Sequence, residues 1–177
     1  LFGGVIPLSN DSITYTGPVQ FQMGRSLHQV ELKHIKGTGA FASDKGKKNK
    51  TFREEYVVPY SLIGFYGIIN ENAGQETKLS EEDVELLLEG MWKGTKNLIS
   101  RTKMGQTPRL LLQVKYSEEN YFIGELKEYI KLMADKRDEQ IRDIEDYQLD
   151  LTALLQVLEE NKDKIEAVRY LTNPRVK

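Results

Sequence analysis

The amino-acid sequence has no cysteine among its 177 residues and no run of about 18 apolar residues. Without cysteine the chain has no disulfide bond and no thiolate metal site, which fits a reducing compartment and predicts a cytoplasmic protein. Without a long apolar run, we expect no membrane-spanning helix and no membrane partner. The first eight residues also lack the basic start and the apolar stretch of a secretory signal peptide.

Catalytic motifs are also missing from the sequence. It contains no nucleophile elbow, no zinc-ligand spacing and no phosphate-binding P-loop. The two histidines, His28 and His34, fall on one predicted strand about 20 Å apart, too far to share a metal ion or to act as an acid–base pair. We therefore predict a protein with no catalytic residue, no metal site and no cofactor.

The length of the chain is enough for one domain with a hydrophobic core. We predict a single domain over residues 1–177, in which an acidic, mostly helical segment covers about 135–177. The chain begins with Leu1-Phe-Gly-Gly4 rather than with methionine. We therefore expect that an N-terminal part of the protein precedes it.

Charge is strongly segregated along the chain, although the net charge is only −2. Residues 23–53 carry eight Lys and Arg against two acidic residues, and residues 91–115 carry six Lys and Arg and no acidic residue. Residues 54–90 and 116–177 are acidic. Two basic blocks on an acidic body are typical of a local phosphate-binding surface, although helix-end charge complementarity and solvated loops give the same pattern.

A β-hairpin with a basic tip is predicted over residues 25–60. Residues 14–23 and 27–35 alternate as short strands, and neither face of the second strand is cleanly apolar. Residues 37–50 are rich in glycine and lysine and predict a long mobile loop. Residues 54–70 return as β-structure, and the apolar run at 62–69 predicts a central, buried strand.

The second half of the chain interleaves predicted helices with strands. Ser80 and Asp83 have the spacing of a capping box and predict a helix over residues 81–101. This order favours an α+β fold with a ferredoxin-like or RNA-recognition-type sheet and an inserted hairpin. The other predicted elements are a strand over 109–116, a helix over 121–133, a helix or charged linker over 135–148, a helix over 151–161 that Asp150 caps, and a strand over 165–171.

The two basic blocks combine cationic side chains with aromatic residues and a glycine. Cations neutralise phosphates, aromatic rings stack on bases, and a backbone can approach a phosphate closely at a glycine. Helix-end stabilisation is an alternative role for Lys93 and Lys96. The candidate RNA-binding residues are Arg25, Lys33, Lys36, Phe41, Lys45, Lys47, Lys48, Lys50, Phe52, Arg101, Lys103, Gly105 and Arg109.

An ordered set of motifs in this sequence resembles one known family. The motifs are Leu1-Phe-Gly-Gly4, Thr16-Gly-Pro-Val-Gln20, Gly24-Arg-Ser-Leu27, Val58-Pro-Tyr60, Trp92-Lys-Gly-Thr-Lys-Asn97 and Lys103-Met-Gly-Gln-Thr-Pro-Arg-Leu-Leu-Leu112. Their order and spacing over roughly residues 1–135 resemble the CRISPR-associated Cas-seven (Csh-two, type I-B) family, whose members are backbone proteins of the Cascade complex in the RAMP superfamily.

The resemblance implies a non-catalytic RNA-binding subunit of a type I Cascade complex for antiviral defence. It also implies a modified RNA-recognition-type fold with a β-hairpin thumb, which maps onto residues 25–60. Several copies are expected to polymerise along one CRISPR RNA, whose guide pairs with target DNA. The expected partners are therefore CRISPR RNA, target DNA, further copies of the chain and other Cascade subunits.

Two alternative functions stay open at this point. The first is an RNA-processing endoribonuclease of the repeat-associated superfamily, with His28 or His34 as general base, although no convergent acid, base and oxyanion set accompanies either histidine. The second is a pure protein-assembly subunit, whose basic blocks bind acidic faces of neighbouring copies.

Overall fold

The computed structural model describes residues 1–38 and 52–176, which form a mixed α+β structure of short strands and three α-helices. Every sheet in these residues is an antiparallel pair of strands. The predicted α+β class is therefore confirmed, whereas an RNA-recognition-type sheet stays a prediction.

In chain order the elements are β1 (Gly3–Pro7), β2 (Ser12–Thr16), β3 (Val19–Phe21), β4 (Arg25–Ser26), β5 (Lys33–Thr38), β6 (Phe52–Val57), β7 (Ile63–Gly64), β8 (Gly67–Ile69), α1 (Glu71–Thr77), α2 (Glu81–Lys96), β9 (Leu110–Tyr116), β10 (Lys131–Met133), β11 (Gln148–Asp150), α3 (Thr152–Glu160) and β12 (Ile165–Thr172).

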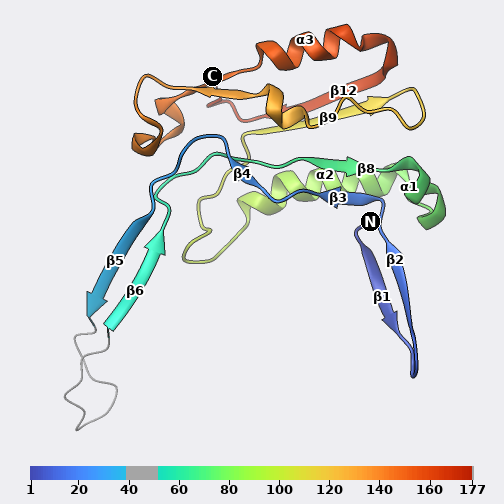
Figure 1. The fold of residues 1–177 in the computed structure, drawn as a ribbon, viewed down its shortest axis with the longest axis horizontal. Helices are drawn as coiled ribbons and strands as arrows, with labels where there is room; N and C mark the ends of the chain where they lie inside the picture. Colours follow the sequence, from blue (N-terminus) through green and yellow to red (C-terminus); the bar gives the residue numbers. More distant parts are fainter. Residues whose placement is uncertain (39–51, 177) are drawn as a thin grey trace.

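Two hairpins extend from the same side of a layered body (Figure 1). The body contains the β9–β12 pair, with α3 on one side of it and the layer of α2, β3 and β8 on the other. The β1–β2 hairpin and the β5–β6 hairpin lie at opposite ends of the body and extend away from β9 and β12. None of the helices in residues 1–38 and 52–176 is long and apolar enough to cross a membrane.

The predicted strand over 14–23 is divided by a tight contact at Gly17. A Cβ atom at Gly17 would lie 2.1 Å from the carbonyl oxygen of Leu1, so only glycine fits there. The chain therefore ends β2 at Thr16 and starts β3 at Val19, which pairs with β8. The prediction of one continuous strand is wrong, and it missed the separate β1–β2 hairpin.

The apolar run 62–69 is not the central, buried strand that the sequence predicts. It forms two short strands, β7 and β8. Strand β7 pairs with β4 and strand β8 pairs with β3, and each has a partner strand on one edge only among the described residues. Leu62 is buried, but Ile63, Phe65 and Ile68 are exposed. Aromatic rings lie over glycines of the opposite segment, since a Cβ at Gly24 would meet the Phe65 ring at 2.5 Å and a Cβ at Gly67 would meet the Phe21 ring at 2.5 Å. These rings cover backbone instead of filling a core.

Helix α2 begins at the predicted capping box. The Ser80 hydroxyl accepts from the Asp83 N–H (3.1 Å), and the Asp83 carboxylate accepts from the Ser80 N–H (3.0 Å). The helix ends at Lys96 rather than at the predicted residue 101, because Asn97 leaves the helical path as the C-cap. Its buried residues, Val84 and Leu87, fix its inner face.

The acidic C-terminal segment is not mostly helical, as the sequence predicts, but mixed. The predicted helix over 121–133 is a short 3-10 turn followed by β10, because Gly124 takes a φ of +112° that ends helical geometry. Residues 135–148 contain two further 3-10 turns, Asp138–Gln140 and Ile144–Asp146. The predicted helix after Asp150 and the predicted last strand are confirmed as α3 and β12, and the Asp150 carboxylate accepts from the Thr152 N–H (2.9 Å).

The hydrophobic core lies at the base of the β5–β6 hairpin. Ile141 has no exposed surface, and it packs with the buried residues Leu62, Ile144 and Tyr147. Three of these four residues come from the densely charged stretch 135–148. The acidic segment therefore packs against the base of the hairpin and supplies most of its core, and it is not a separate tail.

Candidate nucleic-acid interface

The β5–β6 hairpin has a face that combines aromatic rings with charged groups. Strand pairing sets His34 opposite Tyr56 and Lys36 opposite Glu54, and opposite residues share a face. The His34 and Tyr56 rings stack at 4.5 Å between centroids, and the Lys36 amine lies 3.7 Å from the Glu54 carboxylate. Phe52 belongs to the same face and is almost fully exposed. This face offers flat rings for stacking and a cation for phosphate.

The other face of the hairpin is joined to the loop that follows α2. Glu55 of β6 accepts hydrogen bonds from both Arg53 and Arg101. Arg101 lies in the loop, so the shared carboxylate links the second basic block to the hairpin. Both guanidinium groups remain more than half exposed while they make this contact.

The loop between α2 and β9 presents the rest of the second basic block. Gly105 takes a φ of +89°, a left-handed conformation that glycine adopts without strain. Lys103 is exposed and Arg109 is half-buried, and neither side chain has an ion-pair partner among residues 1–38 and 52–176. The Arg109 carbonyl accepts from the Asn173 N–H (2.9 Å), which fixes the end of the loop.

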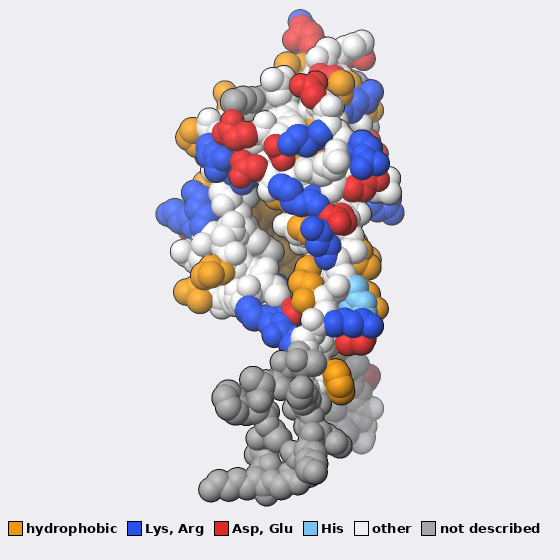
Figure 2. All heavy atoms as spheres, turned by 90° about the vertical axis from the view of Figure 1, so that its left-hand side faces the viewer, with side chains coloured by type: hydrophobic (Ala, Val, Ile, Leu, Met, Phe, Trp, Pro, Cys, Tyr) orange, Lys and Arg blue, Asp and Glu red, His pale blue; other side chains and the backbone are white. Residues whose placement is uncertain are grey.

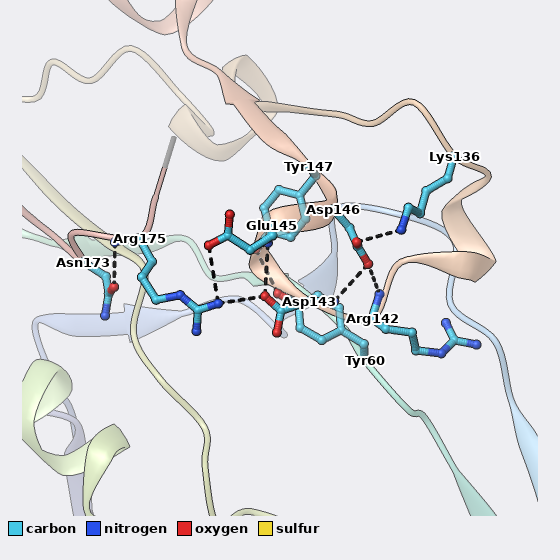
Figure 3. A network of polar contacts seen from close by, with 9 residues as sticks. All are labelled: Tyr60, Lys136, Arg142, Asp143, Glu145, Asp146, Tyr147, Asn173 and Arg175. Carbon is cyan, nitrogen blue, oxygen red and sulfur yellow. Dashed lines mark hydrogen bonds and ion pairs between the residues drawn. The ribbon is translucent and has the colours of Figure 1, made fainter.

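The root of the hairpin is held by hydrogen-bonded rings. His28 is buried, its Nε2 accepts from the Leu62 N–H (3.4 Å), and its Nδ1 lies 3.0 Å from the Gln29 carbonyl oxygen. The Tyr60 and Tyr147 hydroxyls are 3.0 Å apart (Figure 3). Burial, followed by the bond to Tyr60, raises the pKa of Tyr147 above its usual value. Both ring nitrogens of His28 are used by the backbone, so His28 serves the fold.

A network of ion pairs surrounds these rings (Figure 3). The Asp146 carboxylate accepts from the Lys136 amine (2.6 Å) and from the Arg142 backbone N–H (2.7 Å). These two bonds lower the pKa of Asp146 from 3.8 to about 2. Arg175 donates to Asp143 (2.8 Å), and the Arg142 side chain pairs with Glu31 just before β5. The acidic segment is thereby fastened to the hairpin root and to the chain end.

Replacing Asp146 with asparagine is expected to lower the melting temperature at pH 7. A carboxyl group whose folded pKa is depressed stabilises the fold above its ordinary pKa, and this contribution is lost as the pH falls toward the folded value. The difference between wild type and Asp146→Asn should therefore narrow as the pH falls from about 4 to about 2. Thermal melts across this range test it, with the exposed Glu119→Gln as control. A difference that stays constant with pH would contradict the assignment.

The structure brings some of the predicted site residues together and leaves others apart. Lys33, Lys36 and Phe52 lie on the hairpin, and Arg101 joins it through Glu55. Lys103, Gly105 and Arg109 belong to the loop. Arg25 lies in β4 and lines a different groove, with Lys127 and Lys131. The remaining predicted residues lie outside the described part of the chain, as does nearly all of the loop predicted at 37–50: Phe41, Lys45, Lys47, Lys48 and Lys50.

Sequence reasoning missed the ion pairs that the cations of the hairpin make within the chain. Lys33 lies 3.6 Å from Glu31, Lys36 pairs with Glu54, and Arg101 pairs with Glu55. The observed register sets residues 33–37 against 53–57, which brings Lys36 beside the acidic residues at the start of β6. A register centred on the predicted 37–50 loop is shifted from it and would have missed this pair. Figure 2 shows the result, a hollowed face with Lys and Arg side chains around it and Asp and Glu among them.

The structure combines two projecting hairpins with faces that carry charged and aromatic side chains. No group of three or more potential metal ligands is found in residues 1–38 and 52–176. A sequence model of the family described as CRISPR-associated protein Cas7 matches residues 1–152. The chain is 33% identical over 166 residues to a CRISPR-associated protein Cas7 of Haloferax volcanii, covering 92% of this chain and 48% of that protein.

The chain therefore belongs to the Cas7 family of CRISPR-associated proteins. This confirms the family that the sequence motifs resemble, while the type I-B branch stays a prediction. The chain spans about half the length of the curated relative that it matches.

Proposed function

We propose that this chain is the thumb-bearing part of a non-catalytic, CRISPR RNA-binding backbone subunit of a type I Cascade complex. Membership of the Cas7 family, together with a β5–β6 hairpin that extends from the body, carries this proposal. Copies of the subunit polymerise along one guide RNA, with other Cascade subunits at the ends. The guide then pairs with target DNA. The subunit acts in the cytoplasm and is of the type I-B branch.

The geometry of the hairpin and loop supports contact with RNA on two surfaces. On one face of the hairpin the stacked rings and exposed Phe52 suit bases and Lys36 suits a phosphate. The loop cations Lys103 and Arg109 suit further phosphates, and Arg101 joins this loop to the opposite face of the hairpin through Glu55. We further propose that an RNA-recognition-type sheet forms with parts of the protein beyond this chain.

Removing Lys103 or Arg109, the loop cations without an ion-pair partner among the described residues, tests the RNA-binding role. Lys103→Ala and Arg109→Ala are each expected to weaken RNA binding by up to about fivefold, since an exposed ion pair contributes at most about 1 kcal/mol. The log–log salt dependence should become shallower by about 0.7 for each lost phosphate contact. The measurement is RNA affinity of the full-length protein at several salt concentrations, with thermal melts in parallel.

Lys93→Ala is the matched control, because Lys93 pairs with Glu89 one turn away within α2. It should leave the RNA affinity and its salt dependence almost unchanged. If Lys103→Ala and Arg109→Ala lower the melting temperature but bind RNA like wild type, the loop is structural and this part of the proposal is wrong.

Neither alternative gains a supporting observation from the hairpin. The ion pairs of Lys33, Lys36 and Arg101 engage these cations with carboxylates of the same chain, so they are no more available to acidic faces of neighbouring copies than to phosphates. An endoribonuclease has less support: His28 is buried and His34 is stacked on Tyr56 beside Glu54. Cleavage of repeat RNA that His34→Ala abolishes would favour the endoribonuclease.

A further inference from the structure

The carboxylate of Glu55 holds two arginines that reach it from different segments. Arg53 lies two residues earlier on the same face of β6, and Arg101 lies in the loop after α2. Arg101 donates to one carboxylate oxygen of Glu55 and Arg53 donates to the other. The Glu55 side chain is 21% exposed, whereas both arginine side chains are more than half exposed. Two guanidinium groups therefore open to solvent around a carboxylate that is more buried than they are.

This cluster has positive charge left over. One carboxylate neutralises one of the two guanidinium groups, so the three side chains keep a net charge of +1. The strand register sets Ile35 opposite Glu55, so it brings no second carboxylate to this position. Lys103, two residues beyond Arg101, has no ion-pair partner among residues 1–38 and 52–176. The cluster can therefore attract a further anion.

A phosphate group fits the place that the Glu55 carboxylate occupies. Guanidinium groups donate to carboxylate and to phosphate oxygens with the same planar geometry. Ion pairs at an exposed surface are weak, so the bonds from Arg53 and Arg101 to Glu55 can be exchanged for others. Two arginines that converge on one anion are thus a phosphate site in which a carboxylate of the same chain already lies.

We propose that Arg53 and Arg101 form a phosphate site for single-stranded RNA, and that Glu55 occupies this site until the strand displaces it. The inference rests on the proposed RNA-binding function and adds Arg53 and Glu55 to the residues that take part in it. Because Glu55 is tethered beside the arginines, its effective concentration there is high, and an isolated phosphate competes with it poorly. A strand that is also held at Lys103 and at other cations brings its phosphate to the site as part of the same chain, and it displaces the carboxylate.

Glu55→Gln tests the exchange, because the amide keeps the shape of the side chain and removes its charge. It should tighten the binding of a short single-stranded RNA by the full-length protein about fivefold. The log–log salt dependence should become steeper by about 0.7 for each arginine that is freed. Glu76→Gln is the matched control, because Glu76 is an exposed acid on α1 without an ion-pair partner among the described residues. It should change the affinity less than about twofold. Affinity that is unchanged or weaker in Glu55→Gln would overturn the proposal.

A second measurement separates displacement from simple repulsion between Glu55 and RNA. When Arg53→Ala and Arg101→Ala are combined, Glu55 has no arginine left to occupy, so adding Glu55→Gln should change the RNA affinity less than about twofold. A full fivefold gain in this background would overturn the exchange, because the carboxylate would then act on RNA directly. Thermal melts of every variant verify that it is folded. Wild-type protein that does not bind RNA would overturn the proposed function itself, whereas a wild type that binds and a Glu55→Gln variant without effect would overturn the exchange alone.

Discussion

Raising the salt concentration from 50 to 200 mM is expected to weaken RNA binding by the full-length protein about a hundredfold. Each phosphate contact on a single strand contributes about −0.7 to the slope of log affinity against log salt. If about half of the ten candidate cations contact phosphate, the slope is about −3.5, and a fourfold rise in salt lowers the affinity by about two orders of magnitude. The effect should be independent of RNA sequence, because phosphate contacts carry no base information.

Filter binding or anisotropy with RNAs of unrelated sequence measures both quantities. The size of the salt-dependence slope also reports whether Lys33, Lys36 and Arg101 leave their intrachain ion pairs when RNA binds. If these cations keep their carboxylate partners, only the unpaired ones release counterions and the slope is shallower. A flat response to salt would contradict phosphate recognition and favour the pure assembly subunit.

Truncating Ile141 to alanine is expected to lower the free energy of unfolding by about 2–5 kcal/mol, the range for large-to-small changes in a well-packed core. Ile141 has no exposed surface and packs against Leu62, Ile144 and Tyr147. Its removal leaves a cavity beneath the hairpin root, next to the Tyr60–Tyr147 hydrogen bond. Urea unfolding of the variant and wild type gives the difference.

Leu155→Ala on α3 is the matched control, because Leu155 is an exposed leucine in a helix. Its effect should stay within about 0.5 kcal/mol, as for most surface substitutions. A loss below about 1 kcal/mol for Ile141→Ala would mean that residues 135–148 are a peripheral linker, as one of the interpretations of the sequence has it.

Local signals in the sequence predicted the elements that depend on local chemistry. The Ser80 and Asp83 spacing predicted the start of α2, and Asp150 predicted the start of α3 to within one residue, since the N-cap is Leu151 and Asp150 accepts from the Thr152 N–H. The hairpin over 25–60 was predicted from strand patterns around a glycine-rich loop, and β5 and β6 form it. Each of these depends on a cap, a turn or an alternation within a few residues.

The core was not predictable in the same way. Ile141, Ile144 and Tyr147 follow one another at intervals of three residues among charged neighbours. They lie in or directly after short 3-10 turns, a spacing that matches neither a strand nor an α-helix period. Only the packing of this stretch under Leu62 reveals its role. The contact of the Phe65 ring with Gly24 likewise joins segments about forty residues apart in the sequence, so no local pattern predicts it.

The site was predicted only in part for a related reason. Composition identified the cations of the two basic blocks, but it does not tell which of them already have a partner. Glu55, which holds Arg53 and Arg101, is contributed by the acidic stretch that was assigned to a separate block. Strand register decides such pairs, so charge blocks counted along the sequence overstate the free positive charge.

The β9–β12 pair decides where this chain can be divided. The match to the family ends at residue 152, yet β12 pairs with β9 from Ile165 opposite Tyr116 to Thr172 opposite Leu110. A fragment ended at residue 152, where the family model's match stops, would strip β9 of its only strand partner in the described residues. It would expose the backbone edge of an apolar strand, which invites aggregation. The boundary for a recombinant fragment therefore lies beyond β12, about twenty residues past the end of the family model's match.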